Sequence, residues 1–397
     1  MLNVINRALG ALGLELRRIQ RPPHGAMTSL KTKAPRKGAA LLAYIVEPFL
    51  LKPGERPPQA HTHHTESLLM AQAFLELGYD VDVIDYRNAR FYPEKPYHFF
   101  ISARTNFVQL AKRLAPTCIK IAHLDTAHFL FNNASAYQRV LDLQRRRGVT
   151  TTSLRVIEHN FAVEHADYLT ILGNGFTEGT YRYAGKPAFR VPVPTPNLYP
   201  DPANKDFDSC RNRFLWLGSG GLAQKGLDLL LEAFKNLTDQ SLIVCGPVDA
   251  PSEREFVAAY REELYHTKNI ATRGWTDVSS AAFTDIAQQC VALIYPSASE
   301  GQAGSVITCL QAGLIPLISY ESGVDVSDFG TILDDCSPEG LRQQIKRLSS
   351  LPVSLLRERS KSAYDYARAN HTGDAYLKRF KEVIQTIEQD SRHSIPS

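Results

Sequence analysis

Apolar residues recur along the chain in short runs and in helical spacings, and the two patterns follow one another almost throughout. Short apolar runs predict buried strands, whereas spacings of three and four residues predict amphipathic helices. Strands are expected at 41–46, 80–86, 98–102, 118–124, 213–218, 241–246, 291–296 and 314–319. Helices are expected at 66–77, 107–115, 226–237, 253–265, 304–313 and 338–351. Strands that alternate with helices predict an α/β fold with parallel sheets and right-handed crossovers.

A polar segment rich in proline divides this pattern into two halves. With 397 residues, the chain is longer than a single hydrophobic core usually serves. We therefore expect two doubly wound, Rossmann-like domains that face a central cleft, with ligands bound at the carboxyl ends of the strands. The expected segments are 1–38, a basic amphipathic helix and linker; 39–193, the N-terminal domain; 194–212, the interdomain linker; 213–372, the C-terminal domain; and 373–397, a C-terminal helix.

Basic residues are concentrated at the N-terminus. Residues 1–38 carry eight Lys or Arg and one Glu, whereas the rest of the chain carries 37 basic and 40 acidic residues. Nothing in this distribution indicates nucleic-acid binding by the main body of the protein. Residues 1–22 combine an apolar helical seam with arginines outside it, which is typical of a helix lying on an anionic membrane surface. The same pattern also fits a helix that packs on its own domain or on a partner.

The six cysteines are scattered without any C-x-x-C spacing, at positions 118, 210, 245, 290, 309 and 336. Such usage favours reduced thiols over disulfides or a zinc site, and therefore a cytoplasmic protein. No run approaches the roughly 18 apolar residues that a membrane span requires. If residues 1–22 bind lipid, we expect peripheral contact at the inner face of the membrane.

A Gly-rich turn follows the strand at 213–218 and leads into the next helix; its glycines are Gly218, Gly220 and Gly221. Backbone amides in such a turn can approach an anion, and Lys225 would add a positive charge. The turn also matches the start of a dinucleotide fingerprint, but Gly246 stands at the end of the next strand, where an acid would hold the ribose. A turn that only packs a strand against a helix is the other alternative.

A second loop with candidate chemistry follows the strand at 291–296. Glu300 can accept hydrogen bonds from hydroxyl groups, as sugar recognition requires, although a lone loop acid is more often simply exposed to solvent. Gly301, Gly304 and Ser305 at the start of the next helix offer free amide donors. Two anion-binding loops with a hydroxyl acceptor suit a diphosphate bonded to a sugar.

Residues 213–345 resemble the C-terminal domain of the group 1 glycosyltransferases, retaining enzymes of the GT-B fold. The resemblance is carried by the Gly-rich turn before "LDLLLEAF", followed in order by "TRGWTD", "VALIYPSASEG", "LQAGLIPLIS" and "DFGTILDD". It implies a nucleotide-sugar-binding C-terminal domain, an acceptor-side N-terminal domain and a C-terminal helix that crosses back to the latter. It also implies retaining transfer from a nucleotide diphosphate sugar, without a further cofactor, to a glycan or lipid-linked acceptor in surface polysaccharide or glycan synthesis.

The resemblance assigns roles to individual residues and also leaves gaps. Glu300 matches the acid that contacts the donor sugar, and Lys225 matches one member of a basic pair that neutralises the diphosphate. The second base, usually an Arg in the Gly-rich turn, is absent, and Arg273 on a neighbouring strand is a candidate replacement. Thr308 stands where a second Glu would hold the ribose, a change that costs on the order of 1–3 kcal/mol of nucleotide binding.

The N-terminal half resembles the family more loosely. His123 ends a strand where the family often places a histidine that lines the catalytic cleft, and a site role stands beside a purely structural one. The candidates on the acceptor side are His61, His63, His64 and Asp125. A zinc site is disfavoured, because H-x-H-H lacks a fixed helical or hairpin spacing, so no metal is expected.

The competing hypothesis is a non-catalytic relative, a carbohydrate-binding or scaffold protein that keeps the fold. The absence of both the second Glu and the loop Arg motivates it. A base that reaches the phosphate position from elsewhere in the fold would favour the enzyme, whereas a cleft filled by side chains would favour the scaffold.

Overall fold

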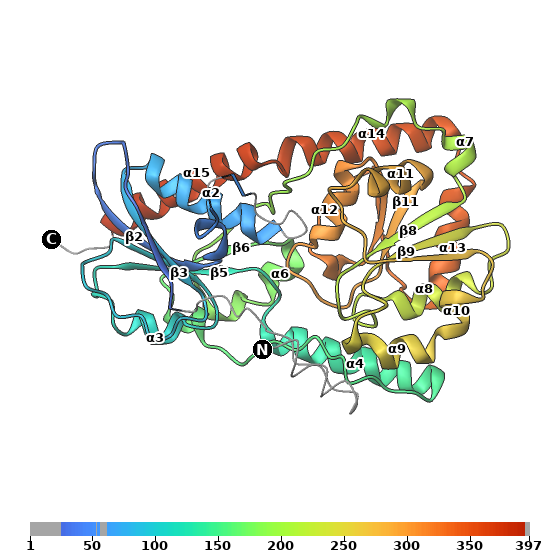
Figure 1. Cartoon of the computed structure of the whole chain (residues 1–397), viewed down its shortest axis with the longest axis horizontal. Helices are drawn as coiled ribbons and strands as arrows, with labels where there is room; N and C mark the ends of the chain where they lie inside the picture. The colour runs from blue at the N-terminus through green and yellow to red at the C-terminus, as the bar shows by residue number, and fades with distance from the viewer. Residues whose placement is uncertain (1–24, 53, 56–61, 394–397) are drawn as a thin grey trace, which may run out of the picture.

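The structure, a computed structural model, describes residues 25–52, 54–55 and 62–393, and in these it contains two sheets (Figure 1). The N-terminal sheet has the strand order β1-β3-β2-β4-β5-β6-β7 and the C-terminal sheet the order β10-β9-β8-β11-β12-β13. Among the described strands only the β1–β3 pairing is antiparallel. The strands are β1 Met27–Leu30, β2 Gly38–Tyr44, β3 Tyr79–Asp85, β4 Phe99–Ala103, β5 Ile119–Leu124, β6 Tyr168–Ile171, β7 Ala188–Arg190, β8 Arg213–Leu217, β9 Ser241–Cys245, β10 Ile270–Gly274, β11 Ala292–Tyr295, β12 Ile315–Ile318 and β13 Thr331–Ile332.

Helices cover both faces of each sheet. Those of the first half are α2 Thr62–Glu76, α3 Phe107–Ala111, α4 Phe129–Arg147, α5 Ala162–His165 and α6 Gly175–Gly179. Those of the second half are α7 Phe207–Cys210, α8 Leu227–Phe234, α9 Arg254–Ala259, α10 Arg261–Tyr265, α11 Ala281–Gln289, α12 Gly304–Gln311, α13 Pro338–Ser349, α14 Val353–Asn370 and α15 Gly373–His393. The α/β prediction with two Rossmann-like domains is therefore confirmed.

The strands are short apolar runs because both faces of each sheet are covered. Every residue of β2 is buried, and its two faces contribute to separate cores of the N-terminal half. The C-terminal half has one large core, built on β8, β9, β11 and β12. Parallel sheets sandwiched between helices need such continuous apolar strands rather than strict alternation.

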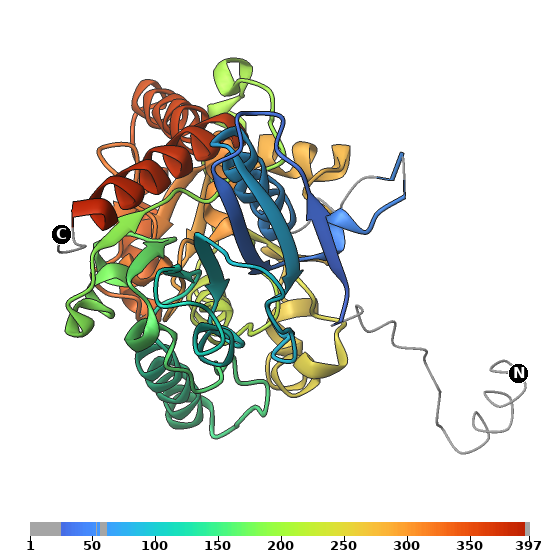
Figure 2. The same cartoon turned by 90° about the vertical axis from the view of Figure 1, so that its left-hand side faces the viewer.

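Residues 27–30 correct the sequence prediction, which placed them in a linker. They form β1, which pairs with β3 at the edge of the N-terminal sheet (Figure 2). The reason is the charge on β3, whose Asp80 and Asp82 are almost fully buried. Ser29 donates to Asp82 at 2.7 Å, and Lys31, just after the strand, pairs with Asp80 at 3.1 Å, so this segment supplies some of the partners that buried carboxylates require. The predicted helix within residues 1–22 lies outside the described residues.

The last two helices connect the halves. Helix α14 packs on the C-terminal core, and after a break at His371 helix α15 lies beside α2 on the N-terminal half (Figure 1). Tyr376, Phe380 and Ile384 of α15 are buried in the same core as Phe74 of α2. Within the described ranges, no helix has the length and apolar composition needed to cross a bilayer.

Helix α4 belongs to the N-terminal half by sequence but reaches across to the C-terminal half. Arg146 pairs with Asp228 and, at 3.1 Å, with Glu232, both on α8. Arg147 pairs with Glu263 of α10 at 2.8 Å. The last turn of α4 thus binds the N-terminal half to helices α8 and α10 of the C-terminal half.

Candidate active site

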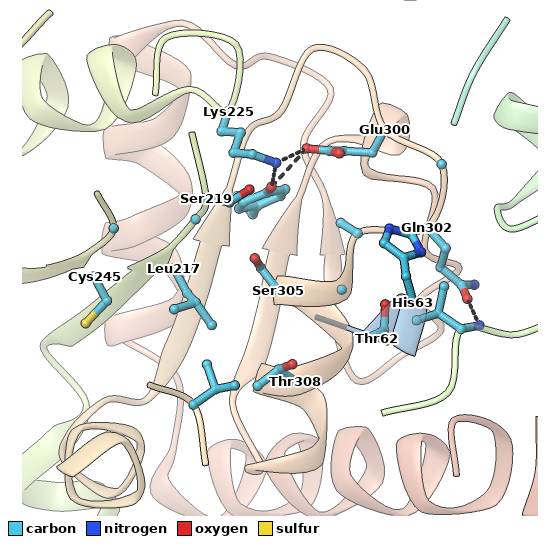
Figure 3. A pocket seen from close by; sticks show the side chains of 18 of the residues that line it. Thr62, His63, Leu217, Ser219, Lys225, Cys245, Glu300, Gln302, Ser305 and Thr308 are labelled. Carbon is cyan, nitrogen blue, oxygen red and sulfur yellow. Dashed lines mark hydrogen bonds and ion pairs between the residues drawn. The ribbon is translucent and has the colours of Figure 1, made fainter. Parts of the chain in front are cut away.

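A cavity of about 160 Å³ lies between the two halves, at the carboxyl ends of the strands (Figure 3). Most of the predicted site residues line it: Gly218, Lys225, Glu300, Gly301, Gly304, Ser305 and Thr308 from the C-terminal half, and His63 and Asp125 from the N-terminal half. Four described candidates do not line it, namely Gly220, Gly221, His64 and His123. His61 lies outside the described residues.

Lys225 and Glu300, which the sequence assigned to different parts of a ligand, are bonded to each other. Lys225 Nζ lies 2.6 Å from Glu300 Oε1 and 2.7 Å from the hydroxyl of Tyr295 (Figure 3). Tyr295 and Ser297 also donate to Glu300 Oε1, at 2.9 and 3.1 Å. Both charged side chains are more than nine-tenths buried. Glu300 Oε1 is therefore saturated by the protein, whereas Oε2 has only Arg155 Nη1, 3.8 Å away, among the described residues.

Burial acts against both charges of this pair. Burial disfavours the Glu300 carboxylate, but Lys225 and Arg155 outweigh it and lower its pKa to about 2. Burial also lowers the pKa of Lys225, with further help from Arg155, to about 8 despite the attraction of Glu300. Glu300 is thus a firmly ionised hydrogen-bond acceptor, held by a lysine that carries its proton less tightly than usual.

The Gly-rich turn contributes less to the cavity than the sequence predicted. The amide of Gly221 donates to the buried carboxylate of Glu253 at 2.6 Å and is therefore not free to bind an anion. Gly221 has a φ of +84° and packs against the side chain of Arg155, so its missing side chain serves close packing. Only Gly218 and Ser219 of this turn reach the cavity wall.

Arg155 supplies a second base beside Lys225, but from the other half of the chain. It lines the cavity, and its side chain is 45 % exposed. Attraction to Glu300 raises its pKa. Arg273, the candidate from the sequence, is exposed and does not line the cavity. Arg155 could not be predicted from the sequence, because it lies in an irregular stretch between α4 and α5 without a motif or periodic spacing.

Helix α12 begins at the cavity without a capping side chain. Gly304 and Ser305 are its first residues, and within the described part of the chain their amides have no acceptor. Ser305 and Thr308 both line the cavity, with Leu217 and Cys245 across from them (Figure 3). Free amides at a helix start carry partial positive charge, so this wall favours an anion.

The N-terminal wall carries a buried network that the sequence did not reveal. His63 Nδ1 lies 2.7 Å from the Tyr44 hydroxyl, which donates to Glu66 Oε2 at 2.8 Å. Behind them, His123 Nε2 lies 3.2 Å from Glu66 Oε1, and its Nδ1 lies 2.8 Å from Thr170. His123 is only 1 % exposed and does not line the cavity. It contacts Glu66, which in turn contacts His63 at the cavity wall.

Glu66 is the centre of this network. Burial disfavours its carboxylate, but His123 and His63 outweigh it and lower its pKa to about 2. The spacing of three residues between His63 and Glu66 on a helix start is the signal that sequence reasoning missed, because such pairs share one helix face. Asp125, the other predicted acid on this wall, is not part of the Glu66 network and pairs with Arg104 at 3.2 Å. Among the described residues, no group of three His, Cys, Asp or Glu is placed to hold a metal ion.

The Glu300 loop also contacts the N-terminal half. The amide of Ala127 donates to the Glu300 carbonyl at 3.2 Å, and Thr177 Oγ1 donates to the Gly301 carbonyl at 3.2 Å. A Cβ atom on Gly301 would collide with the Asp125 carbonyl. Gly301 is therefore required by the close approach of the two halves, and the cavity is seen in a closed arrangement.

No known family model matches the chain, and no curated protein matches its sequence. Solved structures do resemble it in fold. Sucrose-phosphate synthase from Thermosynechococcus elongatus matches with a TM-score of 0.65 and 13% identity, covering 89% of this chain and 100% of its own. A glycosyltransferase from Rickettsia africae matches with a TM-score of 0.57 and 11% identity, covering 91% and 100%. HepE from Anabaena in complex with UDP matches with a TM-score of 0.56 and 11% identity, covering 88% and 100%. The chain thus has the GT-B fold, two Rossmann-like domains around a cleft.

Proposed function

We propose that this protein is a glycosyltransferase that moves a sugar from a nucleotide diphosphate sugar to a hydroxyl acceptor. The observation that carries the proposal is the grouping of Glu300, Lys225 and Arg155 beside the uncapped start of α12, in a cavity between two sheets of the GT-B fold. Amides that can bind the diphosphate lie next to an ionised carboxylate that can accept hydrogen bonds from sugar hydroxyls, so the site suits both parts of such a donor. The UDP and UDP-glucose complexes of HepE, a protein of the same fold, give the donor class further support.

In the proposed reaction, Glu300 Oε2 accepts a hydrogen bond from a donor-sugar hydroxyl. The amides of Gly304 and Ser305, with Arg155, stabilise the negative charge that develops on the leaving diphosphate, which is where electrostatic catalysis acts. Thr308 offers a hydroxyl to the ribose. Lys225 holds Glu300 in place rather than contacting phosphate directly.

We propose retention of anomeric configuration, on the resemblance of residues 213–345 to the retaining group 1 enzymes. The bond between the anomeric carbon and the diphosphate oxygen breaks, and its electron pair stays on the diphosphate. The acceptor oxygen bonds to the same face of the sugar, and its proton passes to the departing oxygen. Neither a redox group nor a further cofactor is needed for this balance.

Donor entry requires opening of the cleft. The cavity of about 160 Å³ is smaller than the roughly 300–1,000 Å³ of typical ligand sites. The chain crosses between the halves twice, near Thr195 and near His371. The two crossings are adjacent, since the amide of Thr195 donates to the His371 carbonyl at 3.0 Å. We propose that the halves open around this junction to admit the donor and close again to exclude water.

For the acceptor, we propose a glycan or a lipid-linked glycan in surface polysaccharide or glycan synthesis. Exposed apolar side chains gather on the N-terminal half after β5, including Leu130, Phe131, Phe161 and Tyr183. Together with the basic, apolar pattern of residues 1–22, they support peripheral contact with an anionic membrane. Co-sedimentation with anionic but not zwitterionic vesicles, reduced by Leu130→Ser, is the expected result; equal recovery with both vesicle types would contradict this contact.

The alternative is a non-catalytic binding or scaffold protein. The internal saturation of Glu300 Oε1 and the Thr at position 308 favour it. A thermal-shift panel of nucleotide diphosphates and nucleotide sugars separates the two, with Glu300→Gln as the site variant and Glu339→Gln, an exposed acid on α13, as the control. In the thermal-shift panel, we expect one donor class to stabilise the wild type and the control. In an activity assay with that donor, hydrolysis or transfer should be lost in Glu300→Gln. The anomeric configuration of the product, read by NMR, then tests retention. Absence of any shift at millimolar ligand would leave the scaffold hypothesis in its place.

A further inference from the structure

His63 is the histidine of the N-terminal wall that reaches the cavity. Its side chain is 41 % exposed and lines the cavity near the start of α12 (Figure 3). Its neighbour Thr62, the first residue of α2, comes within 3.6 Å of where a Cβ on Gly304 would lie. The starts of α2 and α12 therefore lie close together at the cavity wall, and His63 lines the cavity beside them.

The network behind His63 fixes which ring nitrogen carries a hydrogen. The hydroxyl of Tyr44 has one proton, which it donates to Glu66 Oε2 at 2.8 Å, because an ionised carboxylate can only accept. His63 Nδ1, 2.7 Å from the same hydroxyl oxygen, must then be the donor in that contact. The nitrogen that gains or loses a proton is therefore Nε2, which has no partner among the described residues.

The charges around the cavity balance without His63. Three bases line or adjoin it, Arg104, Arg155 and Lys225, and three carboxylates face them, Glu66, Asp125 and Glu300. A diphosphate that enters the cavity adds more than one negative charge, and a single arginine or lysine cannot neutralise it. Lys225 is already committed to Glu300 and Arg104 to Asp125, which leaves Arg155 and a protonated His63.

Several elements act on the proton of His63. Burial lowers its pKa, but Glu66 on its own helix outweighs this effect and Asp125 after β5 adds to the rise, against Arg104 after β4, so the pKa is raised. Tyr44 on β2 contacts the His63 ring, and His123 on β5 contacts the Glu66 carboxylate. The other charged residues that line the cavity with His63 are Asp125, Glu300, Lys225 and Arg155.

We propose that His63 binds the donor diphosphate as an imidazolium, with Nε2–H donating to a phosphate oxygen, and that nucleotide binding takes up a proton at this residue. The inference rests on the proposed function, since it names one more residue of the donor site. It assigns to the N-terminal half a phosphate contact that Arg155 shares, so that donor binding draws the two halves together.

Isothermal titration of UDP, GDP and ADP, in buffers of different ionisation enthalpy, measures this proton uptake directly. For whichever nucleotide binds, we expect wild type to take up more protons than His63→Gln, and its affinity to fall by up to tenfold per pH unit above the pKa of His63. His266→Gln, an exposed histidine away from the cavity, should behave as wild type. Subtraction of the His63→Gln result removes protons taken up by the nucleotide itself.

A second variant separates charge from structure. His63→Lys carries an ammonium with a pKa of about 10, so it should retain nucleotide affinity at alkaline pH while losing the proton uptake near neutrality. Nucleotide binding with equal proton uptake in wild type and His63→Gln would overturn the inference and leave the proposed function intact. Failure of all three nucleotides to bind wild type at any pH would instead overturn both.

Discussion

The two walls of the cavity bury charge in opposite ways. On the C-terminal wall, burial disfavours both charges of the Lys225–Glu300 pair: Lys225 and Arg155 still lower the pKa of Glu300, but burial and Arg155 lower the pKa of Lys225, so the charged lysine is disfavoured. On the N-terminal wall, the pKa of Glu66 is lowered and that of His63 is raised, so each partner favours the ionised state of the other. The first wall holds the Glu300 carboxylate at little net gain in stability, whereas the second contributes stability as well as position.

The largest expected effect comes from breaking the C-terminal pair on one side only. Lys225→Met should lower the free energy of unfolding by about 3–5 kcal/mol, because the buried Glu300 carboxylate then keeps its neutral donors Tyr295 and Ser297 but has only the distant Arg155 as a charged partner. Lys225→Met combined with Glu300→Gln should recover most of this loss, since no uncompensated charge remains. Urea unfolding followed by circular dichroism measures both variants. A double variant as unstable as Lys225→Met would show that the pair itself stabilises the fold.

The pH dependence of stability sharpens the same comparison. The pKa of Lys225 is about 8 in the folded protein against 10.5 ordinarily, so its contribution is fully present above pH 10.5 and lost as the pH falls through 8. The pKa of Glu300 is about 2 against 4.5, so its contribution is fully present above pH 4.5 and lost as the pH falls through 2.

We therefore expect the stability difference between wild type and the double variant to be near zero at neutral pH. It should grow in favour of wild type by about 3 kcal/mol between pH 8 and 10.5, and shift against wild type by a similar amount between pH 4.5 and 2. Unfolding by urea at each pH gives the difference, in which the titration of distant groups cancels. A difference independent of pH would contradict these pKa shifts.

The sequence predicted the fold because its strands are apolar runs in a parallel sheet, and it brought Lys225 and Glu300 to one cavity because carboxyl ends of neighbouring strands meet. It did not predict that these two bond to each other, since they are 75 residues apart and the bond depends on the pairing of β8 with β11. Strand β1 was missed because its four residues are half exposed and follow a basic segment. Arg155 was missed because its role depends on how the two halves pack.

Arg155 tests whether the N-terminal half supplies the missing base. Arg155→Ala should weaken nucleotide diphosphate binding by about tenfold, because one charge-assisted contact to phosphate is lost. Arg273→Ala is the matched control and should bind as wild type, since Arg273 is exposed and outside the cavity. Titration calorimetry gives both dissociation constants. The reverse order of effects would return the second base to the C-terminal half, as the sequence first indicated.

Thr308 offers an expected change of the same size as that of Arg155, but in the favourable direction. Thr308 is 6 % exposed on the C-terminal wall, where the resemblance expects an acid that holds the ribose. Thr308→Glu should tighten nucleotide binding by about tenfold, because an ionised acceptor forms a stronger bond to a hydroxyl than Thr does. The matched variant Thr308→Gln has similar size without charge and should gain less. Weaker binding by both variants would mean that the ribose needs the space that the small Thr308 side chain leaves and not a hydrogen bond from this position. Threonine would then be the residue that suits this site, rather than a sign that the site has lost its nucleotide.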